Sequence, residues 1–233
     1  MIPIFSEPSN HTTYRNTSGV VVPSVTSIIH MINKPELVHW ANSLGFKRKS
    51  VSKELDVSAY IGDITHKLVE IYTTTGKYSY DIIDRKGPVE RLGIKNAFLS
   101  FLQMYKTEHP HIEIHDTEVQ LAGEKFGGTT DLLAKYHGKF TIGDYKTSKG
   151  FYPTMFLQIA GYDLLLRELG LFKAEQYVVF LLDKRDGRPA KIKICDDKDQ
   201  MQLYRKCFKT LVDFYYDWYM INQRYWGKDL LVK

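Results

Sequence analysis

The chain has little cysteine and no long apolar run. Its 233 residues include only 2 cysteines, Cys195 and Cys207, which cannot form a disulfide framework or supply four thiolates to an iron–sulfur cluster. The longest apolar run, residues 177–182, is far shorter than the roughly 20 residues of a membrane span. No charged segment leads into an apolar stretch at the start. We therefore expect a cytoplasmic protein with no iron–sulfur cluster and no membrane partner.

Several sequence patterns are also missing. The phosphate-binding pattern G-x-x-x-x-G-K-[ST] does not occur, so we expect neither ATP binding nor an ATP-driven motor. Internal repeats, Gly/Ser linkers and long like-charge runs are absent as well. With 43% apolar or aromatic residues, 25% charged residues and 8 prolines, the composition excludes a disordered or fibrous chain. We interpret residues 1–233 as a single domain, because one core of this size can bury most of its apolar surface.

The net charge of +5 is a modest excess that is compatible with a polyanionic partner such as DNA. The basic residues gather at two places. One of them is our candidate DNA-binding region, and it consists of Lys47, Arg48, Lys49 and Lys53. The other consists of Lys184, Arg185, Arg188, Lys191 and Lys193. Both are equally compatible with ordinary solvated loop charge.

The spacing of apolar residues and the distribution of β-branched and aromatic residues divide the chain into three parts. Apolar residues recur at intervals of three and four over most of residues 1–110, which predicts a mainly helical N-terminal part. Residues 111–195 hold three β-like runs, a helix that begins near Pro153, and two further strands. Residues 196–233 predict a long aromatic-rich C-terminal helix. This order favours an α/β fold with a central mixed sheet flanked by helices.

A short loop in the middle part brings two aspartates together. If His137-Gly138 forms a two-residue hairpin loop, Tyr136 pairs with Lys139. In that register Asp131 lies directly opposite Asp144 on the same face. Like charges at such positions repel each other, with Cβ atoms roughly 4.5–5.5 Å apart. A one-residue slip would turn one carboxylate to the other face.

A hard divalent cation would offset this repulsion, because Mg²⁺ prefers carboxylate oxygens and accepts phosphate oxygens. Lys146 follows Asp144 by two residues and therefore shares its face. An ammonium there can orient water or stabilise charge on a phosphate. Together these residues have the parts of a phosphodiesterase. The alternative interpretation is a strand-end aspartate beside a solvated ion pair.

Neighbouring segments add further candidates. Gln158 and Tyr162 lie one helical turn apart and can both hydrogen-bond a lysine, a water or a phosphate. His66 lies on a predicted helix and can complete a carboxylate metal site. Glu118, in the strand before the glycines, is a possible additional acid. Each also has a structural interpretation, as a core tyrosine with its rim glutamine, a structural histidine or an outward-facing strand residue.

The motifs, in order, are Gly62-x-x-x-His66, Glu118, Gly128-x-x-Asp131, Asp144-x-Lys146 and Gln158-x-x-x-Tyr162. This set resembles RecB-type nucleases of the PD-(D/E)XK superfamily, which have a restriction-endonuclease-like core. Residues 127–148 and the early Pro23-Ser24-Val25-Thr26 are similar to mitochondrial genome maintenance exonucleases and their phage relatives. The C-terminal helix carries no matching motif.

The resemblance implies a role for each residue. His66, Asp131, Asp144 and the backbone carbonyl of Tyr145 would hold Mg²⁺ or Mn²⁺. Lys146 would assist the attacking water, and Gln158 and Tyr162 would position Lys146 or the scissile phosphate. The two cysteines exclude the iron–sulfur relatives, and we expect no attached helicase of the kind found in the largest relatives.

We therefore expect a metal-dependent DNA exonuclease that acts on ends or single strands, in the host cytoplasm if the chain is phage-encoded. Two alternatives stay open. One is a structure-selective or sequence-selective endonuclease that uses the same hairpin. The other is a DNA-binding recombination or packaging factor with a vestigial site.

Overall fold

A computed structural model describes residues 12–32, 35–84 and 87–226 of the chain. Its centre is a five-stranded sheet with the strand order β3-β4-β5-β6-β7. Strands β5 and β6 are parallel, and the other neighbours are antiparallel. The five strands are β3 (Ile112–Ala122), β4 (Gly127–Tyr136), β5 (Lys139–Lys146), β6 (Gln176–Leu181) and β7 (Lys191–Cys195).

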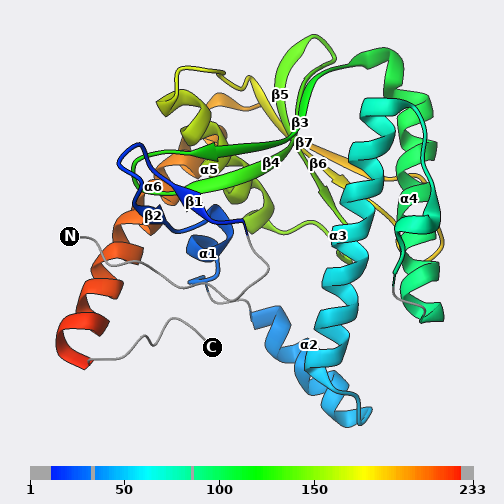
Figure 1. The fold of residues 1–233 in the computed structure, drawn as a ribbon, viewed down its shortest axis with the longest axis horizontal. Helices are drawn as coiled ribbons and strands as arrows, with labels where there is room; N and C mark the ends of the chain where they lie inside the picture. Colours follow the sequence, from blue (N-terminus) through cyan, green and yellow to red (C-terminus); the bar gives the residue numbers. More distant parts are fainter. Residues whose placement is uncertain (1–11, 33–34, 85–86, 227–233) are drawn as a thin grey trace.

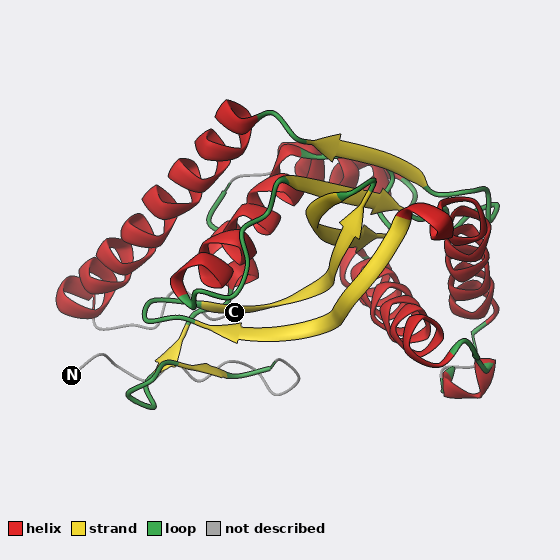
Figure 2. Cartoon of the chain, turned by 90° about the horizontal axis from the view of Figure 1, so that it is seen from above, coloured by secondary structure: helices red, strands yellow, loops and turns green. Residues whose placement is uncertain are grey.

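Helices cover both faces of this sheet (Figures 1 and 2). One face packs against α1 (Val25–Ile29), α5 (Pro153–Glu168) and α6 (Lys198–Ile221), and the other against α3 (Val51–Thr75) and α4 (Pro88–Glu108). The alternation of the strands explains the two cores, because successive side chains point to opposite faces. Tyr177 and Val179 join the α5 side, whereas Val178 and Phe180 join the α3–α4 side.

Helix α5 is the crossover between the two parallel strands. Parallel neighbours need such a connection, since the chain must return to the starting edge before the second strand begins. The helix begins with Pro153 at its first turn, where a missing N–H costs nothing. Its Gly161 lies against Phe208 of α6, and a Cβ there would come within 2.8 Å of that ring. Close packing of α5 on α6 therefore requires glycine at this position.

Smaller elements complete the described residues. A two-stranded ribbon precedes α1, and α2 (Pro35–Phe46) leads into α3 through a turn in which Arg48 has a φ of 53°. Single turns of other helix types flank α4 and end α6. These elements are β1 (Tyr14–Arg15), β2 (Val21–Val22), η1 (Tyr80–Ile82), η2 (His109–His111) and η3 (Asn222–Trp226).

The predicted fold class is confirmed: the chain is α/β, with a mixed sheet flanked by helices as in a restriction-endonuclease-like core. The predicted helix start at Pro153 and the long C-terminal helix are also confirmed, with Asp197 as the N-cap of α6. The β1–β2 ribbon was not predicted, because two-residue strands are too short to show a periodic pattern. None of the helices among the described residues has the length and apolarity to cross a bilayer.

Candidate active site

The β4–β5 hairpin sets the position of the two predicted aspartates. His137 and Gly138 form its turn with φ angles of 50° and 77°, the two positive values that a type I′ turn requires. Tyr136 pairs with Lys139, and the ladder continues to Leu132 opposite Gly143. The predicted register is therefore confirmed as far as this last pair, and Asp131 and Asp144 are the residues directly beyond it.

Both carboxylates lie in the interior, where each has a different partner. Asp131 is 9% exposed, and its Oδ2 accepts a hydrogen bond from the backbone N–H of Tyr145 at 2.8 Å. Asp144 is fully buried. Lys146 Nζ donates to Asp144 Oδ1 at 2.8 Å and lies 2.7 Å from Oδ2. The ammonium therefore faces both oxygens of this carboxylate.

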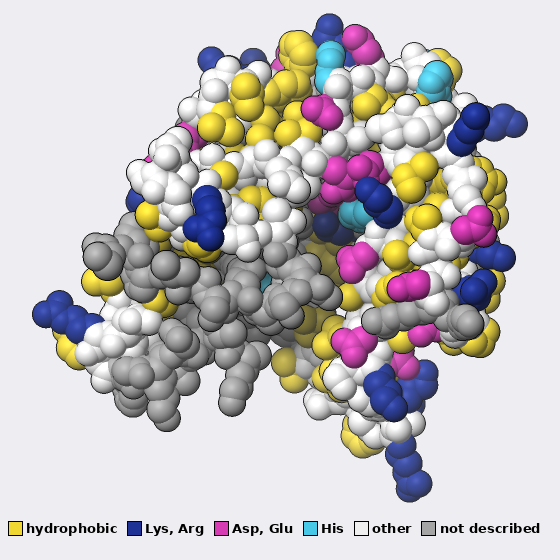
Figure 3. Space-filling view, viewed as in Figure 1, with side chains coloured by type: hydrophobic (Ala, Val, Ile, Leu, Met, Phe, Trp, Pro, Cys, Tyr) yellow, Lys and Arg dark blue, Asp and Glu magenta, His cyan; other side chains and the backbone are white. Residues whose placement is uncertain are grey.

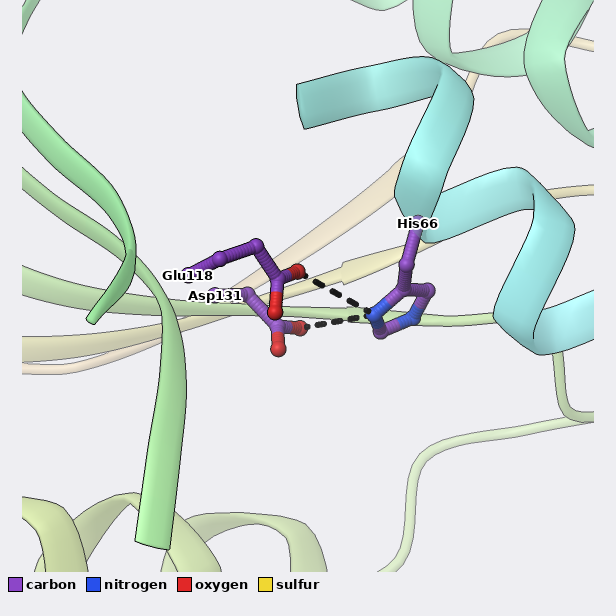
Figure 4. Close-up of side chains that lie close together, drawn as sticks. All are labelled: His66, Glu118 and Asp131. Atoms are coloured by element: carbon purple, nitrogen blue, oxygen red, sulfur yellow. Dashed lines mark ion pairs between the residues drawn. The ribbon is translucent and has the colours of Figure 1, made fainter. Parts of the chain in front are cut away.

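Two further side chains meet Asp131 from other elements (Figure 4). Nδ1 of His66, on α3, lies 3.5 Å from Asp131 Oδ2 and 4.0 Å from Glu118 Oε1. One ligand atom from each of the three residues falls within 4.8 Å of the others. Glu118 adopts a φ of 51°, which is uncommon for a non-glycine residue and costs of order 1–3 kcal/mol. The strand thus accepts local strain at the residue whose carboxylate faces His66.

The charges in this group shift one another's protonation. Burial disfavours the imidazolium, but attraction to Asp131 outweighs it and raises the pKa of His66 to about 9. Burial and the charge of Asp131 raise the pKa of Glu118 to about 7. Burial also raises the pKa of Asp144 to about 6, although Lys146 opposes the shift. Burial lowers the pKa of Lys146, but Asp144 and Asp131 outweigh it, so the ammonium is retained.

These residues fit a hard divalent cation. An imidazole nitrogen and carboxylate oxygens are ligands that Mn²⁺ accepts, and Mg²⁺ takes the oxygens. Burial is the main cause that raises the pKa values of Glu118 and Asp144, and the nearby cations do not offset it fully. Asp144 Oδ2 lies 2.7 Å from the Lys146 ammonium, and a carboxylate oxygen keeps a second lone pair for a further ligand. A cation near Asp131 would neutralise these carboxylates and could bind Asp144 Oδ2.

Helix α5 brings the two remaining predicted residues to the same place. Gln158 Nε2 donates to the hydroxyl of Tyr162 at 2.7 Å. Burial and the charges of Asp144 and Asp131 raise the pKa of Tyr162 well above its ordinary value, so the hydroxyl stays protonated beside the acids. A Cβ at Gly128 would come within 2.6 Å of the Tyr162 ring. The glycine before Asp131 therefore makes room for this tyrosine.

A cavity of about 930 Å³ leads away from the site. Lys146 and Gln158 line it, together with side chains from α2, α3 and α4. Figure 3 shows acidic, basic and histidine side chains gathered around a hollow in this view of the molecule. The lining combines cations with apolar groups. The cations are Lys47, Lys49, Lys146, Lys149, Lys184 and Arg185, and the apolar groups include Leu37, Trp40, Leu44, Leu55, Val89 and Leu92.

The structure separates the four predicted DNA-binding residues. Lys47 and Lys49 line the cavity, although Lys49 also pairs with Glu54 at 2.9 Å. Arg48 lies in the turn after α2, Lys53 lies in the first turn of α3, and neither is in the lining. Tyr145 points its ring into the α3–α4 core. The proposed metal-binding role of its carbonyl stays a prediction.

Sequence reasoning did not select Trp40, Lys149, Lys184 or Arg185 as site residues, although all four line the cavity. The helical elements that surround them come from distant parts of the chain, so no local pattern predicts the cavity. One signal was available. Lys149 and Lys184 each follow a predicted strand by a few residues, and the ends of two parallel neighbours lie at the same edge of a sheet.

The chain has only distant similarity to known proteins. No family model and no curated protein matches the chain. Among solved structures it is similar to SSO0001, with 18% identity and a TM-score of 0.38 over 86% of this chain and 79% of that one. A phage-related exonuclease from Haemophilus somnus 129PT has 12% identity and a TM-score of 0.36, covering 92% and 97%. LHK-Exo in complex with dAMP has 11% identity and a TM-score of 0.34, covering 72% and 91%. These values establish neither a family nor a shared activity.

Proposed function

We propose that this chain is a metal-dependent nuclease that hydrolyses phosphodiester bonds of DNA, acting as an exonuclease on single strands or free ends. One observation carries the proposal. His66, Glu118 and Asp131 converge beside the Asp144–Lys146 pair, next to a cavity lined by cations. Two similar structures are a phage-related exonuclease and LHK-Exo, but the proposal depends on the site alone.

The acidic group is the proposed cation site. His66, Asp131 and Asp144 would hold Mg²⁺ or Mn²⁺, with Glu118 as a further carboxylate and the Tyr145 carbonyl as a backbone ligand. The cation would supply positive charge for the phosphate and make a bound water more acidic. Asp131 accepts the N–H of Tyr145, and this hydrogen bond holds its carboxylate toward His66.

Lys146 and the α5 pair would act on the scissile phosphate. Because the pKa of Lys146 is raised by Asp144 despite burial, its side chain stays an ammonium and cannot remove a proton from water. It would instead orient the attacking water and donate to a phosphate oxygen as negative charge develops there. Gln158 and Tyr162 are hydrogen-bonded to each other and would position Lys146 or the phosphate. No covalent enzyme intermediate is required.

The lining of the cavity supports a single-stranded or frayed substrate. Lysine and arginine attract the phosphates of the strand, and apolar or aromatic side chains contact bases that are no longer stacked in a duplex. Trp40, Leu44 and Leu55 supply such a surface in the same cavity as the cations. A duplex would present its phosphates outward and leave this apolar surface uncovered.

The decisive experiment is digestion of 5′-labelled and 3′-labelled single and double strands in Mg²⁺, Mn²⁺ or EDTA. We expect trimming from ends in either metal and none in EDTA. Closed circular DNA is the matched substrate, because it has no end. Efficient cutting of circles would favour the endonuclease alternative. Binding without cleavage in both metals would favour the non-catalytic DNA-binding alternative and contradict the proposal.

A further inference from the structure

A second group of cations lies at the carboxyl ends of the two parallel strands. Lys146, the last residue of β5, is the ladder partner of Leu181, the last residue of β6. Lys149 and Lys184 each follow these partners by three residues in sequence. Ligands of open α/β sheets bind outside the carboxyl ends of parallel strands. The topology therefore delivers two lysines from different loops to one edge of the sheet.

These lysines and Arg185 line the same cavity as Lys146. Lys184 is partly buried, and its Nζ donates to Ser58 Oγ of α3 at 2.7 Å. Among the described residues, no carboxylate lies within ion-pair distance of Lys149, Lys184 or Arg185. Burial and the charges of Arg185 and Lys149 lower the pKa of Lys184. The group therefore carries positive charge that the protein itself does not neutralise.

The turn that carries Lys184 and Arg185 is held in place. The carboxylate of Asp183 accepts the N–H groups of Arg185 and Asp186 at 2.9 and 3.3 Å. Ser100 of α4 accepts the N–H of Asp183 at 2.9 Å, and Asn96 of α4 donates to the carbonyl of Arg185. The turn is thus fixed before any ligand arrives, which reduces the entropy lost on binding.

We propose that Lys149, Lys184 and Arg185 form a subsite for a non-scissile phosphate of the nucleic-acid strand. An anion there would neutralise cations that are close together and only partly solvated. The inference deepens the proposed function and rests on it for the identity of the ligand. The phosphate belongs either to the interior of the strand or to its 5′ end, and the two sources share the same recognition chemistry.

The test measures binding in EDTA, so cleavage does not enter. Fluorescence anisotropy would give Kd for single-stranded oligonucleotides with a 5′-phosphate or a 5′-hydroxyl, at several salt concentrations. The variant is Lys149→Ala/Lys184→Ala. Its matched control is Arg188→Ala/Lys191→Ala, which removes the same charge from residues that do not line the cavity. A thermal unfolding curve for each variant establishes that it folds.

We expect Kd of the Lys149/Lys184 variant to rise about tenfold and its slope of log Kd against log salt to fall by about 0.7, as for one lost phosphate contact. The control should stay within about twofold, and Lys184→Arg should bind nearly as well as the original. An equal loss with both oligonucleotides indicates an interior phosphate. A loss confined to the phosphorylated one indicates a 5′ end, and both results support the subsite.

The proposal is overturned if the two double variants lose affinity equally, because the effect would then be one of general charge. Unchanged Kd and salt slope, or absence of binding by the original chain, also overturns it. The outcome is separable from that of the nuclease proposal. If the original chain cleaves DNA but the Lys149→Ala/Lys184→Ala variant loses no more affinity than its control, the nuclease proposal stands without this subsite. If the variant loses affinity specifically but the original chain does not cleave, only the subsite stands.

Discussion

The acid of one cluster, Asp163, is neutralised by nearby cations, whereas the acids of the candidate active site are neutralised only in part. Asp163 of α5 is fully buried, and both of its oxygens are bonded. Oδ1 accepts from Arg167 Nε at 2.8 Å, and Oδ2 accepts from Arg205 Nη1 at 3.0 Å and the Tyr177 hydroxyl at 2.7 Å. This cluster joins α5, β6 and α6. Its charge is compensated by two guanidinium groups, as expected of a buried acid that holds elements together.

The candidate active site contains more negative charge and less compensation. Lys146 and His66 are the cations that act on Asp131 and Asp144. Glu118 has His66 and also Lys67, which is itself paired with Glu70. The pKa of Glu118 is raised to about 7 and that of Asp144 to about 6, mainly by burial. Buried carboxylates with raised pKa values do not stabilise a fold, so a purely structural role would not explain this cluster. The comparison therefore separates an acid that stabilises the fold from acids that we assign to a ligand.

The largest expected effect is on catalysis. Lys146→Ala should lower the cleavage rate by about 10³-fold, because it removes a positioned donor from the scissile phosphate. Asp131→Asn and Asp144→Asn should abolish metal-dependent cleavage. Single-turnover digestion of a labelled oligonucleotide measures the rate, with circular dichroism to establish folding and anisotropy to establish that DNA binding is retained. Lys139→Ala, at the other end of β5, is the matched control. Unchanged cleavage by folded Lys146→Ala would remove this lysine from the mechanism.

The next effect concerns the structural acid. Asp163→Ala should lower the free energy of unfolding by about 3–5 kcal/mol, because Arg205 and Arg167 lose a buried partner. Asp144→Asn should lower it by less, because burial already disfavours the charged form of Asp144, although Lys146 loses its partner. Urea unfolding of the two variants side by side would show the contrast. Equal destabilisation would abolish the distinction between the two groups.

Metal affinity should depend on pH. Glu118, Asp144 and His66 take up protons with pKa values of about 7, 6 and 9 in the metal-free protein, and a cation must displace those protons. Raising the pH from 6 to 8 should therefore tighten Mn²⁺ binding by at least about tenfold. Calorimetric titration in buffers of different ionisation enthalpy measures both the affinity and the protons released. Affinity that is flat across this range would argue against these ligands.

The smallest effect is a gain in stability. The folded-state pKa of Glu118, about 7, lies above its ordinary 4.5, so the metal-free fold loses stability as the pH rises from about 4.5 to about 7, and the loss is complete above that range. Glu118→Gln should raise the free energy of unfolding by about 1 kcal/mol at pH 8, after allowance for partial solvation, and by little at pH 5. It should also weaken Mn²⁺ binding. A variant that is less stable at pH 8 would show that Glu118 serves the fold.

The sequence predicted the hairpin well because its determinants are local. His137-Gly138 has the residues of a tight turn, and the apolar runs on either side leave one register. The placement of Asp131, Asp144 and Lys146 followed from that register. The α/β class followed from the order of helical and strand periodicities, since these patterns persist over many residues.

Other features could not be read from the sequence because they depend on distant contacts. Glu118 reaches His66 through a positive φ within β3, and no strand pattern predicts such a residue. The cavity forms where α2, α3 and α4 meet the loops after β5 and β6. Its surface therefore depends on tertiary packing, and the basic residues Lys184 and Arg185 could not be distinguished from solvated loop charge.

The type I′ turn has a consequence for how this chain can change over evolutionary time. Asp131 stands six residues before His137 and Asp144 six residues after Gly138, so the tip of the hairpin is the midpoint between them. A single-codon insertion or deletion at that tip would misalign the two acids, even though the turn touches no substrate. We expect natural relatives to keep the number of these tip residues and to draw them from residues that tolerate positive φ, such as glycine and asparagine.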